Sequence, residues 1–213
     1  MKKYFFQVTS ILIFIFSVIG FSDNLFTDVG QKSNSDPKFI IHGLCCFAWI
    51  VILVIQANFI RTGNIKAHVK LGIAGMVAAA GVFITTVYIF VVIYKGWDAM
   101  PYYVKSNRLF MPLFGIWVWL GYRNRKKPVL HKRFMYIATL YMLGPILDRA
   151  IDHFYLDRIM SEFVMYDVTV KVIWGLFFIF LFMYDWKTLR KVHPLSITGA
   201  AFFVITWLIA IYT

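Results

Sequence analysis

Charged residues are scarce in this chain of 213 residues. Only 15% of the residues are charged, whereas 61% are hydrophobic. An average soluble domain is about 25% charged and about 45–50% apolar. A soluble core of this size could not hide so many apolar side chains, so the composition excludes an ordinary soluble domain. It predicts one membrane-embedded domain that comprises residues 1–213.

Cysteine is nearly absent and acidic residues are few. The two cysteines, Cys45 and Cys46, are adjacent, so on a helix they point about 100° apart and no disulfide framework is expected. Lys and Arg number 22 against 10 acidic residues, which gives a formal net charge of +12. The basic residues stand in short segments between apolar runs, where membrane topology accounts for them. We therefore expect the lipid bilayer, and not nucleic acid, to be the partner of this charge.

Long runs with few charges recur along the chain and predict its fold class. A transmembrane helix needs about 20 apolar residues to cross the bilayer core. We expect an all-α, polytopic transmembrane helix bundle of about seven helices: Tyr4 to Ser22, Lys38 to Ile60, Lys70 to Tyr94, Leu109 to Tyr122, Phe134 to Ile151, Val164 to Tyr184 and Leu195 to Thr213. The fourth run is the weakest, because it is short and contains Pro112. The first run has an alternative as a signal peptide, since two lysines precede it and a small-x-small pattern ends it.

The distribution of basic residues predicts the orientation of the bundle. With the N-terminus inside, most Lys and Arg residues fall in the cytoplasmic segments, and Asp185 is the only acidic residue there. The other acidic residues, Asp157 and Glu162 among them, fall at the outer side. The positive-inside rule thus predicts a cytoplasmic N-terminus and an outside C-terminus, in the inner (cytoplasmic) membrane of a cell.

Small residues are concentrated in the third run, between Gly72 and Gly81. Such residues let the backbones of neighbouring membrane helices approach closely. They supply no chemistry, so we expect a packing face here.

Ionisable residues at the outer ends of two runs form a candidate metal site. Asp148 and Asp152 are four residues apart and share a helix face, and His153 follows directly. If the second run packs against the fifth, His42 completes a set of nitrogen and oxygen ligands that suits zinc or another divalent transition metal. The alternative is a solvated ion-pair network that involves Arg149.

A second candidate site lies at the inner ends. His68, His131 and His193 each stand just ahead of a run, and Asp185 lies in a strongly basic segment, so it needs a partner. The ordinary partner is Arg190 or Lys187 in the same loop. The alternative is a histidine that the carboxylate orients as a metal ligand or proton carrier.

Three stretches carry a resemblance to known membrane proteins. They are His42-Gly43 with Trp49, Gln56, Arg61, His68 and Gly72; His131, Arg133 and Met135 with Arg149; and Tyr184-Asp185 with Arg190 and His193-Pro194. Together they resemble uncharacterised bacterial multi-helix membrane proteins, and the first is similar to the transmembrane di-haem cytochrome b reductases. That resemblance implies two b haems, one held by His42 and His153 and one by His68 and His131. Since 22 residues separate His131 from His153, about 33 Å along a straight helix, these haems would lie at opposite membrane faces.

Three classes of function follow from these candidates. The first is a haem- or metal-binding membrane redox protein. The second is a zinc-dependent membrane hydrolase, although the chain lacks the two histidines at i and i+4 that such families carry. The third is a non-enzymatic transporter, assembly factor or structural membrane protein. The sequence does not decide whether the protein is an enzyme.

Overall fold

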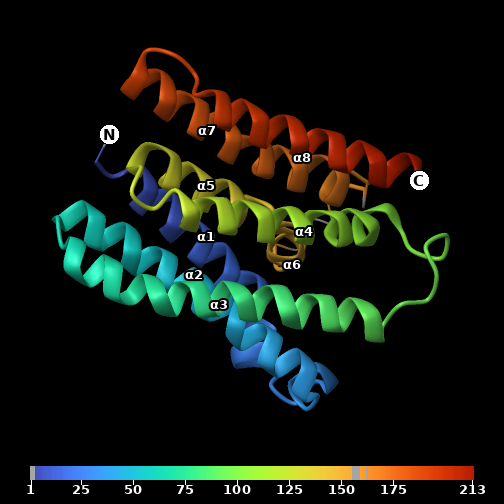
Figure 1. The fold of residues 1–213 in the computed structure, drawn as a ribbon. Helices are drawn as coiled ribbons and strands as arrows, with labels where there is room; N and C mark the ends of the chain where they lie inside the picture. Colours follow the sequence, from blue (N-terminus) through green and yellow to red (C-terminus); the bar gives the residue numbers. More distant parts are fainter. Residues whose placement is uncertain (1–2, 155–158, 162) are drawn as a thin grey trace. The chain divides into compact units, whose positions relative to one another are not determined.

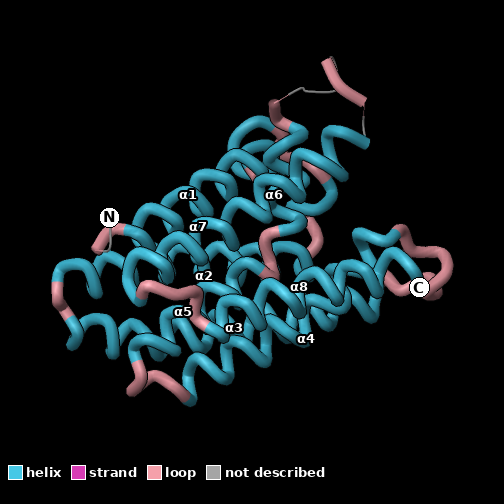
Figure 2. Tube along the Cα trace, turned by 90° about the horizontal axis from the view of Figure 1, so that it is seen from above, coloured by secondary structure: helices cyan, strands magenta, loops and turns pink. Residues whose placement is uncertain are grey.

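The computed structural model describes residues 3–154, 159–161 and 163–213. Within these ranges the chain forms helices and no strand (Figures 1 and 2). The helices are α1 (Phe5–Gly20), α2 (Pro37–Thr62), α3 (Ile65–Val92), α4 (Tyr102–Arg123), α5 (Pro128–Leu140), α6 (Gly144–Asp152), α7 (Lys171–Leu189) and α8 (Pro194–Tyr212). Short π or 3₁₀ turns are η1 (Asp23–Thr27), η2 (Lys32–Asn34) and η4 (Phe163–Val170). The all-α prediction is confirmed.

Each of the seven apolar runs contains helix, and several are long enough to cross a bilayer. By length and composition, four described helices qualify: α2, α3, the stretch Val164–Leu189 and α8. The pair α5 and α6 adds a fifth if it is one broken span. Helix α1 is apolar but has only 16 residues. The chain is therefore a multi-pass membrane protein, and the count of seven spans stays a prediction.

One predicted span is interrupted. The run from Phe134 to Ile151 was expected as one helix, but α5 ends at Leu140 and α6 begins at Gly144. Proline has no N–H for the i→i−4 bond and its ring clashes with the preceding turn, so Pro145 belongs near a helix start. The distance of about 33 Å along a straight helix therefore does not apply.

Local sequence signals set other helix ends. The Asp36 side chain accepts a hydrogen bond from the Lys38 backbone N–H at 3.1 Å, and Pro37 occupies the first turn of α2. The helix ends at Thr62 and is capped by Gly63, whose φ of 78° favours glycine. Helices α5 and α8 also start with proline, at Pro128 and Pro194.

The structure groups into two compact units. The first contains Met1–Thr85 and Pro145–Trp174, and the second contains Thr86–Gly144 and Gly175–Thr213. Helices α3 and α7 each contribute residues to both units. The prediction of a single domain over residues 1–213 is not decided by this grouping.

Close helix packing holds the first unit together. Helix α1 packs against α2. On α3, a Cβ atom added to Gly81 would lie 2.7 Å from the Cys45 sulfur, and one added to Gly75 would lie 3.3 Å from Ile52. The small residues of α3 thus let it approach α2, as predicted.

Aromatic rings fill the second unit, where α4 packs against α5 and α8. The Phe110 ring of α4 stacks on Phe203 of α8 with centroids 4.8 Å apart. The Tyr141 hydroxyl donates to the Gly199 carbonyl at 2.8 Å, so the buried phenol has a partner. The ring stack therefore ties α8 to α4, and the hydrogen bond ties α8 to the segment after α5.

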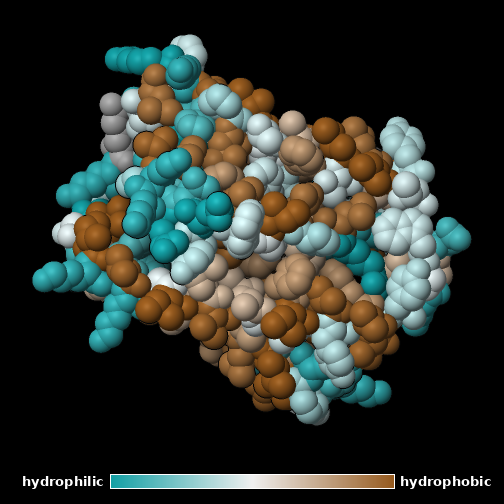
Figure 3. All heavy atoms as spheres, viewed as in Figure 1, coloured by the Kyte–Doolittle hydropathy of each residue, from teal (hydrophilic) through white to brown (hydrophobic). Residues whose placement is uncertain are grey.

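The outer surface of α3 is apolar. Ile73, Val77, Ile84 and Val91 recur at helical spacing and are 65–70% exposed. Apolar side chains also occupy much of the face in Figure 3. An exposed apolar stripe of this length is the surface that lipid covers in a membrane protein.

Replacing Gly20 by Ala should destabilise the protein. An added Cβ would lie 2.8 Å from the Ile146 carbonyl oxygen and 3.0 Å from the Ala150 nitrogen, and these backbone atoms of α6 cannot rotate away. We expect a loss of about 1–3 kcal/mol, the usual cost of overpacking, by equilibrium unfolding in mixed micelles. Gly43→Ala is the matched control, because nothing lies within 4 Å of its added Cβ. Equal stability of both variants would contradict close packing between α1 and α6.

Candidate functional site

A buried ion pair is the centre of the polar groups in the second unit. The Arg133 side chain on α5 is 1% exposed and the Asp185 side chain on α7 is 0% exposed. Arg133 Nε donates to Asp185 Oδ1 at 3.0 Å, and Nη2 donates to the same oxygen. Its Nη1 donates to the Val129 carbonyl at 2.6 Å. The guanidinium is therefore neutralised and hydrogen-bonded on all three nitrogens.

The second oxygen of Asp185 binds α8 and the segment before it. Asp185 Oδ2 accepts the Ser196 hydroxyl at 2.6 Å and the His193 backbone N–H at 3.0 Å. The carboxylate therefore joins α5, α7 and the start of α8. Because both oxygens already accept from the protein, a metal at Asp185 would have to displace these donors.

The partner of Asp185 differs from the expected one. The sequence suggested Arg190 or Lys187 in the same loop, but the ion pair is with Arg133, 52 residues away. Arg133 belongs to one of the stretches that carry the resemblance, but the sequence did not identify it as a site residue. The sequence signal was the lone acidic residue in a basic segment, and spacing alone could not choose its partner.

His193 caps a helix through its side chain. Its Nδ1 accepts the Leu195 backbone N–H at 3.1 Å at the start of α8. Nδ1 therefore carries the lone pair and, in a neutral ring, Nε2 carries the proton. Burial lowers the pKa of His193, the nearby Arg133 charge lowers it further, and Asp185 acts in the opposite direction. The predicted role of His193 as a metal ligand competes with this cap.

His131 has the opposite arrangement of its ring nitrogens. It lies in the first turn of α5, and its Nδ1 lies 2.8 Å from the Gly121 carbonyl oxygen of α4. A carbonyl can only accept, so Nδ1 donates and Nε2 carries the lone pair of the neutral ring. The neighbouring Lys132 donates to the Tyr184 hydroxyl at 2.7 Å.

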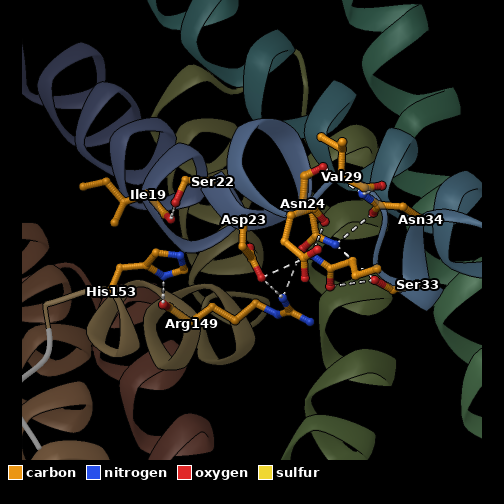
Figure 4. Close-up of polar contacts among 11 residues, drawn as sticks. Ile19, Ser22, Asp23, Asn24, Val29, Ser33, Asn34, Arg149 and His153 are labelled. Atoms are coloured by element: carbon orange, nitrogen blue, oxygen red, sulfur yellow. Dashed lines mark hydrogen bonds and ion pairs between the residues drawn. The ribbon is translucent and has the colours of Figure 1, made fainter.

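In the first unit, a polar cluster joins the segment after α1 to α6 (Figure 4). Arg149 Nη1 donates to Asn24 Oδ1 at 3.2 Å and lies 3.9 Å from Asp23 Oδ2. Its guanidinium also lies over the Phe21 ring, 4.9 Å from the centroid. His153 Nδ1 lies 2.8 Å from the Arg149 carbonyl oxygen, so it donates to it.

The pKa of Asp23 reports the balance of forces in this cluster. Burial alone would raise it, but hydrogen bonds from the Asn24 backbone and the Gln31 side chain, with the charges of Arg149 and His153, lower it overall. Arg149 is thus paired with the segment after α1, and the sequence did not single out Asp23 or Asn24.

The residues of the predicted outer metal site contact different partners. Asp152 accepts a hydrogen bond from the Tyr166 hydroxyl. Asp148 is half-buried and interacts electrostatically with Lys171. Among the residues that the structure describes, no three His, Cys, Asp or Glu side chains gather as a group able to hold a metal. Asp157 and Glu162, expected at this side, lie outside the described residues.

His42 lies on α2, and its side chain contacts α3. Its Nδ1 is 3.0 Å from the Thr85 hydroxyl oxygen, and Thr85 donates its own proton to the Gly81 carbonyl at 2.7 Å. Thr85 therefore accepts from His42 Nδ1–H, and Nε2 carries the lone pair. The Cys46 sulfur lies 3.6 Å from this Nε2.

The sequence placed His68 just ahead of the third run. In the structure it lies in the first turn of α3. Its backbone carbonyl accepts the Gln56 side-chain N–H at 3.0 Å. Gln56 thus ties α2 to α3 across their connection, which is interhelical hydrogen bonding.

Comparisons of the chain with protein families, with curated proteins and with solved structures found no match. The case for a function therefore depends on the residues and their geometry.

Replacing Asp185 by Asn should strongly destabilise the protein, because it leaves the buried Arg133 guanidinium uncompensated. We expect a loss of about 3–5 kcal/mol by equilibrium unfolding in micelles. The double variant Arg133→Met with Asp185→Asn should lose less than the sum of the two single variants. Asp23→Asn is the control, since its pair with Arg149 is partly exposed and worth at most about 1 kcal/mol. Additive single variants would mean that the two residues act independently.

Acid should destabilise the protein through His193. Its pKa is lower in the folded state than the ordinary 6.5, so the unfolded state binds more protons and stability falls as pH drops below that value. His193→Asn keeps a capping acceptor but cannot titrate. We expect a shallower fall in Tm between pH 7.5 and pH 5.5 for this variant than for the unchanged protein. Parallel curves would assign the acid sensitivity to other groups.

Proposed function

We propose that this multi-pass membrane protein is a redox protein that binds a b-type haem or a transition metal through histidine Nε2 atoms. The observation that supports the proposal is shared by three rings. His42, His131 and His153 each direct Nδ1 at an oxygen acceptor, within 2.8–3.0 Å. Each neutral ring therefore carries its lone pair on Nε2.

This arrangement is the one that ligating histidines use. A histidine that binds a metal commonly donates its other ring N–H to a carbonyl, carboxylate or water, which fixes the tautomer and the ring orientation. Haem iron is held by such imidazoles, and a b haem would supply one-electron transfer. The protein would contribute the orientation of each ring and the apolar surroundings of the helices.

The pairing of ligands follows the resemblance to di-haem cytochrome b reductases. It nominates His42 with His153, which both lie in the first unit, as one pair, and His131 as a ligand of the second haem. The proposal includes the predicted topology, with the N-terminus inside, the C-terminus outside and the protein in the cytoplasmic membrane. The basic residues of the connecting segments support this orientation.

An absorption spectrum tests the proposal. The protein, purified in detergent that retains cofactors, is measured before and after dithionite, together with elemental metal analysis. We expect reduced-minus-oxidised haem bands or a stoichiometric redox metal, and loss of the cofactor in His131→Ala and His153→Ala. His193→Asn is the matched control, because the His193 Nδ1 lone pair is already used by Leu195 and the variant keeps a cap.

The outcomes separate the three classes. Stoichiometric zinc without colour would favour the hydrolase. Neither haem nor metal, or full cofactor content in both alanine variants, would overturn the proposal and leave a transporter, assembly or structural role.

A further inference from the structure

A basic pocket lies at the turn between α4 and α5, in the second unit. Its volume is about 470 Å³, within the range of small-ligand sites. Six residues line it: Trp119, Tyr122, Arg123, Asn124, Arg125 and Lys127. Three of these are cations and none is acidic, so the pocket favours an anion.

Aromatic rings hold two of the cations in place. The Arg123 guanidinium lies over the Trp119 ring at 5.8 Å, and that of Arg125 lies over the Tyr122 ring at 4.4 Å. Arg125 Nη1 also donates to the Tyr122 carbonyl at 3.2 Å. A guanidinium already held over a ring loses less freedom when it binds a ligand, and its fork of donors matches phosphate oxygens.

The turn itself is fixed. The Asn124 side chain donates to the Leu120 carbonyl at 2.8 Å, and its backbone N–H donates to the same oxygen at 3.0 Å. This closes the last turn of α4, so the cations on either side of Asn124 have a defined backbone. The lining is therefore a shaped site and more than a run of basic residues.

The position of the pocket along α4 indicates which kind of anion reaches it. Trp119 and Tyr122 are exposed side chains in the last turns of α4, where aromatic residues settle at the headgroup level of a bilayer. The turn falls on the side that the basic residues predict to be cytoplasmic. Basic pockets at such helix ends bind phosphate-bearing lipid headgroups.

We propose that the pocket at the α4–α5 turn binds the phosphate of an anionic phospholipid headgroup. Arg123, Arg125 and Lys127 contact the phosphate oxygens, and the two rings contact the apolar part of the headgroup region. The proposal does not depend on a haem or metal elsewhere in the protein.

The alternative explanation is that these cations only set the membrane topology. Lys126 distinguishes this explanation from a phosphate-binding pocket. Lys126 is exposed, stands in the same turn and carries the same charge, but it does not line the pocket. Replacing Lys126 by a neutral residue lowers the positive charge of this turn by the same amount as replacing Lys127. A pocket predicts unequal effects, and net charge predicts equal ones.

The full-length protein in detergent is titrated with phosphatidylglycerol, with phosphatidylcholine and with inorganic phosphate, and binding is followed by native mass spectrometry. We expect phosphatidylglycerol to bind more tightly than the other two. Arg125→Gln and Lys127→Gln should each weaken it by about fivefold, the usual effect of one cation near anionic lipid, and Lys126→Gln by less than about twofold. Circular dichroism checks that each variant is folded.

Three results would overturn the proposal. Equal loss in Lys126→Gln and Lys127→Gln would mean that only net charge matters. Equal affinity for phosphatidylcholine would mean that the headgroup charge is not recognised. Inorganic phosphate that binds as tightly as phosphatidylglycerol would make free phosphate the ligand.

Discussion

The carboxylate of Asp185 accepts hydrogen bonds from the Arg133 guanidinium, the Ser196 hydroxyl and the His193 backbone N–H. A buried charge in an apolar bundle is costly unless it is neutralised and fully hydrogen-bonded. Both conditions hold here, and the donors come from α5, from α8 and from the residue that caps α8. The direction in which α8 leaves the α7 connection is thus fixed by one side chain of α7. The aromatic contacts among Phe110, Tyr141 and Phe203 then fill the space that this connection defines.

The same network decides what His193 can do. Its Nδ1 holds the Leu195 N–H, and the Arg133 charge disfavours a second positive charge on its ring. His131 lies two residues before Arg133 on α5, yet its Nδ1 donates to the Gly121 carbonyl. Two histidines near one ion pair therefore have opposite tautomers, because one faces a backbone donor and the other a backbone acceptor. This difference separates a helix cap from a potential ligand more sharply than position in the sequence does.

The helical fold was predictable because its signals are local. Apolar composition over about 20 residues places helices such as α2 and α8, and proline and glycine set several of their ends. The break between α5 and α6 also had a local signal, the dipeptide Gly144-Pro145, which the long apolar run concealed. The partner of Asp185 had none, since it depends on which helices pack together. Likewise, the tautomer of His131 depends on a carbonyl ten residues away whose direction only the folded turn sets.

The pairing of Asp185 with Arg133 also bears on how the cations of the α4–α5 turn are explained. Asp185 is the only acidic residue predicted for the inner segments, and Arg133 neutralises it inside the second unit. The cations at the turn, Arg123, Arg125 and Lys127, therefore have no carboxylate among the residues that line their pocket. Basic side chains at a helix end are ordinarily explained by topology alone. Here Asp185, the one acidic residue that the sequence predicts for the inner segments, pairs with Arg133 and helps to hold the second unit together, and the described lining of the pocket contains three cations and no carboxylate.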